Sequence, residues 1–152
     1  VRDLNNQTLD ALKFIEKAIN LDSENPEYWY IFAEFLSKLG KITEAEDAFK
    51  KVVELDPGNI DAWIDYSNFL FENTSKTRAI KEVERAIVTN KGDQDLKLRL
   101  IAMQIASGKI ADAKSKLIDF QQNENSSIQK LFEIYPEIKN IPEIIEVIKK
   151  EK

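Results

Sequence analysis

A fixed interval recurs along the chain and constrains the fold more than any other feature. Alanine keeps this interval, here called the repeat interval, at four positions: Ala11, Ala45, Ala79 and Ala113. The same interval separates Trp29 from Trp63 and Gly58 from Gly92. A bulky apolar residue follows each of these alanines by four positions. Several residue types that keep one period indicate an array of repeated structural units.

The period that covers residues 26–59 predicts two helices joined by a turn. Pro26 favours the start of a helix, where its missing N–H costs no hydrogen bond. Apolar residues then follow helical spacing at Trp29, Phe32, Ala33 and Leu36. Gly40 predicts the end of this helix, because a left-handed residue is least strained without a Cβ. A second apolar stripe follows at Ile42, Ala45, Phe49, Val52 and Val53.

The same pattern divides the whole chain. It predicts one solenoid over residues 1–152, divided into a partial repeat, two full repeats, a degenerate repeat and C-terminal capping helices. These segments are residues 1–25, 26–59, 60–93, 94–127 and 128–152. The degenerate repeat over residues 94–127 departs from the pattern, since Lys97 stands where the two full repeats have tryptophan.

The residues from Trp29 to Pro57 resemble the tetratricopeptide repeat. That repeat is a helix–turn–helix unit of about 34 residues. The resemblance covers residues 8–121 and implies an all-α, right-handed α-solenoid whose first helices line a concave groove. Residues 8–25 match the second helix of an earlier repeat, whose first helix would be represented only by residues 1–6. We therefore expect the chain to be the C-terminal part of a longer repeat array.

The tail is expected to cap the array. Ser126 and Ser127 are candidate N-caps for a short helix that Tyr135 and Pro136 would end. A last helix over residues 143–151 would turn Ile144, Ile145 and Ile148 inward, since the end of a solenoid needs a polar outer face. A helix that binds a partner or a membrane surface is the alternative, and its mixed charge disfavours the membrane version.

The composition excludes several classes of chemistry. The chain has no Cys and no His, which removes disulfides, thiolate nucleophiles and the commonest transition-metal ligands. Its formal charge of −5 disfavours nucleic-acid binding, and no apolar run reaches the length that crosses a membrane. Glycine-rich phosphate loops are absent, and carboxylate pairs such as Asp61 and Asp65 are expected by chance in such acidic helices. The sequence therefore predicts a protein that is not an enzyme, with no cofactor and no metal.

The predicted partner-binding groove is the stripe opposite the tryptophan face on the three first helices. Its residues are Glu27, Tyr30, Ile31, Glu34, Lys38, Asp61, Ile64, Asp65, Asn68, Phe71, Glu72, Asp95, Leu98 and Arg99, with Ala102 and Ile105 continuing the third stripe. Six of them are acids and two are bases. An ordinary solvated helix face is the alternative, but apolar residues among exposed acids favour an interaction site.

The groove predicts the chemistry of its partner. We expect a protein or peptide segment that mixes basic with apolar side chains. Some members of the resembled family hold acidic C-terminal tails in a clamp of Lys, Asn and Arg. Of the corresponding residues in this chain, only Arg99 fits that clamp. Asn68 stands where the family often holds a peptide backbone.

Two other functions are also predicted as alternatives. One is a structural spacer or self-assembly module, with weak self-association through an open N-terminal end at Ile15 and Ile19. The other is an accessory domain of a larger protein whose activity lies upstream.

Overall fold

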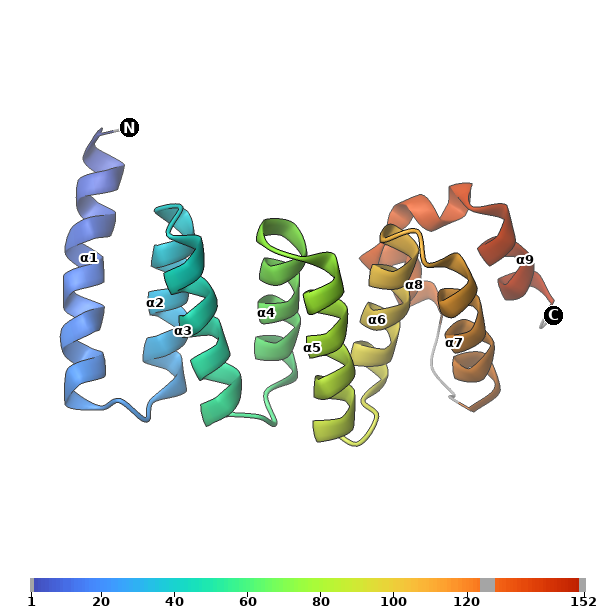
Figure 1. Ribbon diagram of the computed structural model, residues 1–152, viewed down its shortest axis with the longest axis horizontal. Helices are drawn as coiled ribbons and strands as arrows, with labels where there is room; N and C mark the ends of the chain where they lie inside the picture. The colour runs from blue at the N-terminus through green and yellow to red at the C-terminus, as the bar shows by residue number, and fades with distance from the viewer. Residues whose placement is uncertain (1, 124–127, 151–152) are drawn as a thin grey trace. The chain divides into compact units, whose positions relative to one another are not determined.

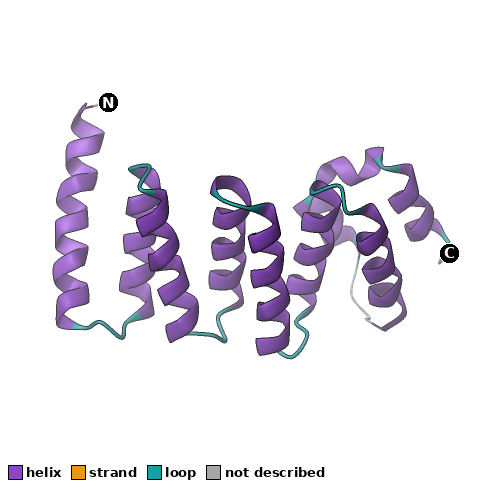
Figure 2. Cartoon of the chain, in the orientation of Figure 1, coloured by secondary structure: helices purple, strands orange, loops and turns teal. Residues whose placement is uncertain are grey.

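The computed structural model describes residues 2–123 and 128–150, and every element in those ranges is a helix (Figure 2). This confirms the predicted all-α class. The chain divides into two compact units, Val1–Ser75 and Lys76–Lys152. Each unit has its own set of packed helices and is described separately below.

The described residues of unit 1 form four helices that pack in chain order (Figure 1). They are α1 (Arg2–Leu21), α2 (Pro26–Lys38), α3 (Ile42–Leu55) and α4 (Ile60–Asn73). Ala33 and Ala45 have no exposed surface, so their small side chains let α2 and α3 approach closely. Phe49 and Phe69 join α3 to α4, with ring centroids 5.1 Å apart.

The polar residues that start the first helices also keep the repeat interval. Asn25, Asn59 and Asp93 are the N-caps of α2, α4 and α6 (Gln94–Ala106), and each side chain accepts a hydrogen bond from a backbone N–H. The three donor–acceptor distances are 3.0, 3.0 and 3.1 Å. Gly40 and Gly108 follow α2 and α6 with φ of 73° and 77°, the left-handed conformation that was predicted from Gly40.

Helix α1 differs from the prediction in two ways. The backbone from Arg2 to Leu21 is one continuous helix, so residues 2–6 extend that helix and are not the remnant of a separate first helix. Ile19 is buried at 8% exposure and Ile15 is half-buried, whereas Phe14 and Leu21 are 71% and 89% exposed. The apolar surface of α1 therefore lies on a different face from the predicted one.

Unit 2 contains the remaining helices. They are α5 (Lys76–Thr89), α6, α7 (Ile110–Asn123), α8 (Gln129–Ile134), the 3-10 helix η1 (Pro136–Asn140) and α9 (Pro142–Lys149). Helix α5 packs on α6 and α6 packs on α7. Ala79 and Ala113 have no exposed surface, like Ala45 in unit 1.

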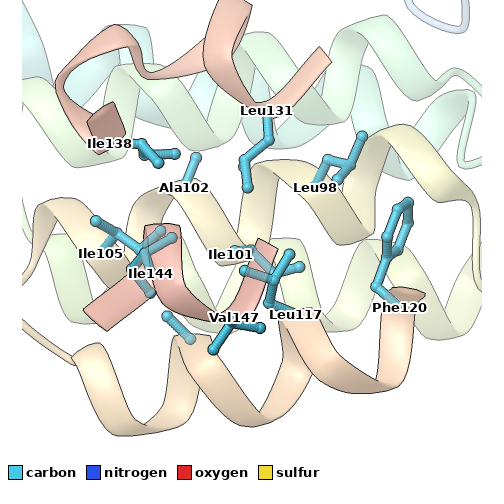
Figure 3. Packing of buried hydrophobic residues seen from close by; sticks show 11 residues of the cluster. Leu98, Ile101, Ala102, Ile105, Leu117, Phe120, Leu131, Ile138, Ile144 and Val147 are labelled. Carbon is cyan, nitrogen blue, oxygen red and sulfur yellow. The ribbon is translucent and has the colours of Figure 1, made fainter. Parts of the chain in front are cut away.

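The tail folds back onto the third pair of helices. Helix α8 packs on α6 and α9 packs on α7, and Figure 3 shows Leu131, Ile138 and Ile144 within the shared apolar cluster. None of these three side chains is exposed, and Val147 is also buried. Val147 lies one repeat interval after Ala113, so the tail keeps the alanine register, a relation that was not predicted.

The predicted ends of the tail helices can be compared directly with the structure. Helix α8 ends before Tyr135 and Pro136, as predicted. The last helix is Pro142–Lys149, close to the predicted residues 143–151. The two proposed serine N-caps lie outside the described residues.

Candidate partner-binding cleft

A cleft of about 440 Å³ lies in unit 1, where the starts of α2 and α4 meet the end of α3. Its lining residues come from these three places: Pro26, Glu27, Tyr30, Val52, Asp56, Asn59, Asp61, Ala62 and Asp65. Four of them, Glu27, Tyr30, Asp61 and Asp65, were predicted from sequence as groove residues. The helix spacing thus brings residues of two consecutive repeats to one surface.

Tyr30 and Asp65 connect the two first helices across the cleft. The Tyr30 hydroxyl donates a hydrogen bond of 2.9 Å to Oδ2 of Asp65. The Tyr30 ring stands edge-on to Phe49, with ring centroids 6.1 Å apart. Burial, followed by the hydrogen bond to Asp65, raises the pKa of Tyr30 to about 12. Asp65 is half-buried in this arrangement, although it was predicted among the exposed acids of the groove.

Asp56 and Asn59 also line the cleft, and neither was predicted from the sequence as a groove residue. Nδ2 of Asn59 donates to Oδ2 of Asp56 at 3.3 Å, while Oδ1 of Asn59 accepts from the Ala62 N–H. Asn59 therefore holds the turn between α3 and α4. The sequence signal for these two residues is their position on either side of Pro57 and Gly58, a turn pattern directly before a predicted helix start.

The cleft is acidic. Four carboxylates line it, of which Glu27 and Asp61 are exposed and Asp56 and Asp65 are half-buried. None of its described lining residues is a Lys or an Arg. Closely spaced carboxylates attract a cation and can accept charge-assisted hydrogen bonds from an ammonium or a guanidinium group.

The other predicted groove residues of unit 1 lie outside the cleft lining. Ile31, Ile64, Asn68 and Phe71 are half-buried on α2 and α4. Glu34, Lys38 and Glu72 are exposed. The Lys38 ammonium lies 5.8 Å from the centroid of the Phe35 ring, which places it along its own helix.

The predicted groove residues on α6 are covered by the chain itself. Leu98 is 1% exposed and Ile105 is 4% exposed, because both belong to the cluster that α8, η1 and α9 complete (Figure 3). The prediction of Leu98 as an exposed apolar anchor was therefore wrong. Asp95 forms an ion pair with Lys130, whose pKa is raised by that hydrogen bond. Arg99 is half-buried on the same helix.

Among the residues that the structure describes, no group of three or more Asp or Glu side chains is arranged to hold a metal ion. Within the same part of the chain, no helix is both long and apolar enough to cross a membrane.

Comparison with known families gives one partial match. The model of a family described as anaphase-promoting complex, cyclosome, subunit 3 matches residues 3–52, which include α2 and most of α1 and α3. No curated protein matches the chain in sequence.

Solved structures share the fold over most of the chain. A MamA chain from Desulfovibrio magneticus RS-1 has a TM-score of 0.60 at 18% identity, and the alignment covers 99% of this chain and 83% of that one. YrrB, described as a TPR protein with an unusual peptide-binding site, has a TM-score of 0.59 at 21% identity over 95% of this chain and 76% of its own.

An O-GlcNAc transferase from Thermobaculum terrenum has a TM-score of 0.56 at 15% identity, over 78% of this chain and 23% of the transferase. At these identities the likeness concerns the fold.

Proposed function

Because the chain has the tetratricopeptide-repeat fold, we propose that it is a non-catalytic module that binds a segment of a partner protein in the cleft of unit 1. The segment carries Lys or Arg beside apolar or aromatic side chains. The observation that carries this proposal is the cleft itself, which has four carboxylates and no Lys or Arg among its described lining residues.

The chemistry of the cleft supports a basic partner group. Asp56 and Asp65 are half-buried, so a cation between them is less screened by water than on an open surface. The half-buried Tyr30 offers apolar surface beside the carboxylates, which suits the stem of a Lys or Arg side chain. A peptide-binding site is described for the TPR protein YrrB, which supports a peptide as the ligand class.

The absence of His and Cys from the sequence supports a non-catalytic role, since these residues supply most general bases and nucleophiles at neutral pH. The transferase with a similar fold aligns over only 23% of its chain. Its likeness therefore carries no argument for transferase chemistry here.

A peptide array followed by calorimetry tests the proposal. Peptides that combine basic and aromatic residues should bind, and matched peptides with Glu in place of Lys should not. Binding should weaken as salt rises, because the Debye length falls to about 8 Å at physiological ionic strength. Equal binding of the acidic peptides would contradict the proposal.

A matched pair of variants locates the site. Asp61→Asn removes a carboxylate of the cleft, whereas Asp47→Asn removes a carboxylate of α3 outside it. We expect the first to weaken binding about two- to fivefold, the range of a partly exposed ion pair, and the second to leave it unchanged. Equal losses would place the binding surface elsewhere.

A second candidate function, self-assembly, is favoured by the apolar surface of α1. Phe14 and Leu21 are two helical turns apart, so they share one helix face, and both are largely exposed. Replacing both with Ser should reduce self-association in sedimentation experiments. Val88→Ser, which removes an apolar residue that is 82% exposed on α5, is the control.

A further inference from the structure

Unit 2 contains a separate cleft of about 220 Å³ between α5, α6 and α7. Its walls are mostly apolar and its rim carries two acids and two lysines. The lining residues are Glu84, Ile87, Lys97, Leu100, Ile101, Lys116, Asp119 and Phe120. This cleft shares no lining residue with the acidic cleft of unit 1.

The repeat interval shows which side chain occupies the position of Lys97 in the earlier repeats. Lys97 stands one repeat interval after Trp63 and two after Trp29. Trp63 is only 1% exposed, and its indole N–H donates to the Pro57 carbonyl at 2.9 Å. The Trp29 indole makes the equivalent bond to the Ser23 carbonyl at 2.8 Å. In both earlier repeats an indole is therefore an integral part of the packing.

The third repeat has Lys97 in place of this indole. The stem of Lys97 lies against the turn between α5 and α6, since a Cβ on Gly92 would stand 3.3 Å from its Cε. Phe120 occupies the register position of Val52 and Ala86 and is 2% exposed. Phe120 and Lys97 both line the cleft.

The remaining cleft suits an aromatic ligand. Apolar cavities of about 150 Å³ in other proteins hold a benzene molecule, so the present volume is large enough for an indole. Phe120, Leu100 and Ile101 line the cleft although each is no more than 4% exposed, and Ile87 beside them is half-buried, so the atoms that an inserted ring meets there are apolar. The Lys97 ammonium at the rim can lie over the face of an inserted ring.

We propose that this cleft binds a tryptophan side chain from a segment of a partner protein. The inserted indole restores the packing that Trp29 and Trp63 provide in the earlier repeats. The ligand differs in chemistry and in place from the basic segment assigned to unit 1, so the two proposals can fail independently.

Methyl NMR on the full chain tests the proposal, with N-acetyltryptophanamide as the probe. Saturable shifts are expected at the methyl groups of Ile87 and Ile101, whereas Ile31 and Ile64 of unit 1 should stay unchanged. N-acetylleucinamide should produce weaker shifts, because it lacks the aromatic contacts. The absence of saturable shifts in the parent chain would overturn the proposal, as would equal binding of the leucine probe.

Substitutions at the cleft provide the second arm. Lys97→Trp fills the cleft, so it should abolish binding of the tryptophan probe and raise the Tm. If a folded Lys97→Trp variant binds the probe as strongly as the parent chain, the proposal is overturned. Lys97→Met keeps the aliphatic stem and should weaken binding about two- to fivefold through the lost cation–π contact. Lys81→Met, at an exposed position of α5 outside the cleft, is the matched control and should bind like the parent.

Phe120→Leu provides a second test of the cleft if Lys97→Trp fails to fold. It removes the aromatic ring but keeps an apolar side chain of similar reach, so binding of the tryptophan probe should fall toward that of the leucine probe. Unchanged preference for tryptophan in this variant would contradict the assigned cleft.

Discussion

The Tyr30 hydroxyl and the Asp65 carboxylate form a hydrogen bond between residues 35 positions apart, and it joins the first helices of two consecutive repeats. Such a bond contributes about 1 kcal/mol to stability when both partners are present. Here it also fixes the position of a cleft carboxylate. Tyr30 therefore acts on the shape of the cleft as well as on the packing.

The raised pKa of Tyr30 predicts a change of stability in alkaline solution. The pKa is about 12 in the folded protein, against about 10 for an unperturbed tyrosine in an unfolded chain. The contribution to stability is therefore complete below about pH 10 and is lost as the pH rises through about 12. Urea unfolding across this range should show the decline, and Tyr30→Phe should remove part of it.

A tyrosinate absorbance titration provides the direct check. A late-ionising component should be present in the parent chain and should be smaller in Tyr30→Phe. Tyr28→Phe, a change to a neighbour on the same helix, is the control and should retain it. A late component of unchanged size in Tyr30→Phe would contradict the raised pKa of Tyr30.

The alanines of the repeat interval predict where the packing tolerates no extra volume. Ala79 has no exposed surface, so Ala79→Leu should cost about 1–3 kcal/mol by overpacking. Lys81→Leu adds a similar side chain at an exposed position of the same helix and should change stability little. Chemical denaturation of both variants tests this, and equal stabilities would contradict the register.

At the residue scale, the sequence predicted buried positions better than polar contacts. The alanine interval correctly identified close-packed sites such as Ala45, because only a small side chain fits where helices approach. The role of Asp65 was not predictable in the same way. Its partner Tyr30 lies one repeat away, and periodicity alone does not show whether two polar side chains on neighbouring helices meet.

At the scale of elements, the tail is a structural part of unit 2. Ile144 and Val147 of α9 lie with Leu117 of α7 in one buried cluster (Figure 3). Leu131 and Ile138 cover the face of α6 that carries Leu98. The tail therefore closes apolar surface that would otherwise be open.

Truncation tests this role of the tail. A chain that ends at Lys139 lacks α9 and exposes the apolar surface around Leu117, so its solubility should fall and its self-association should rise. Light scattering measures both changes. Glu143→Ala, an exposed substitution at the start of α9, is the control, and a soluble, monomeric truncated chain would contradict the capping role.

Helix positions were predictable because their ends carry strong local signals. Pro26, Gly40 and Pro136 each mark a boundary that the structure contains. The face against which the tail folds was not predictable, since an amphipathic pattern shows that a helix buries one side without naming its neighbour. That is why Leu98 was expected in the groove and is found under α8.

At the scale of the whole molecule, the boundaries of the sequence repeats do not coincide with the boundary between the compact units. The repeat over residues 60–93 contains α4 of unit 1 and α5 of unit 2, since the division falls at Ser75. The division of one solenoid into five repeat segments stays a prediction. In repeat proteins, stability is a sum of local terms, and different parts can unfold separately.

Both tryptophans lie before residue 76, and this gives the chain a built-in optical label for one half. Trp29 and Trp63 belong to unit 1, so indole fluorescence reports on that unit alone, whereas far-ultraviolet circular dichroism reports the helices of both. Since each unit has its own core, we expect the two signals to give different midpoints in a urea titration. Superimposable curves would mean that the halves unfold as one cooperative body. A spectrometer can therefore compare the two halves in the unmodified protein, without any attached dye.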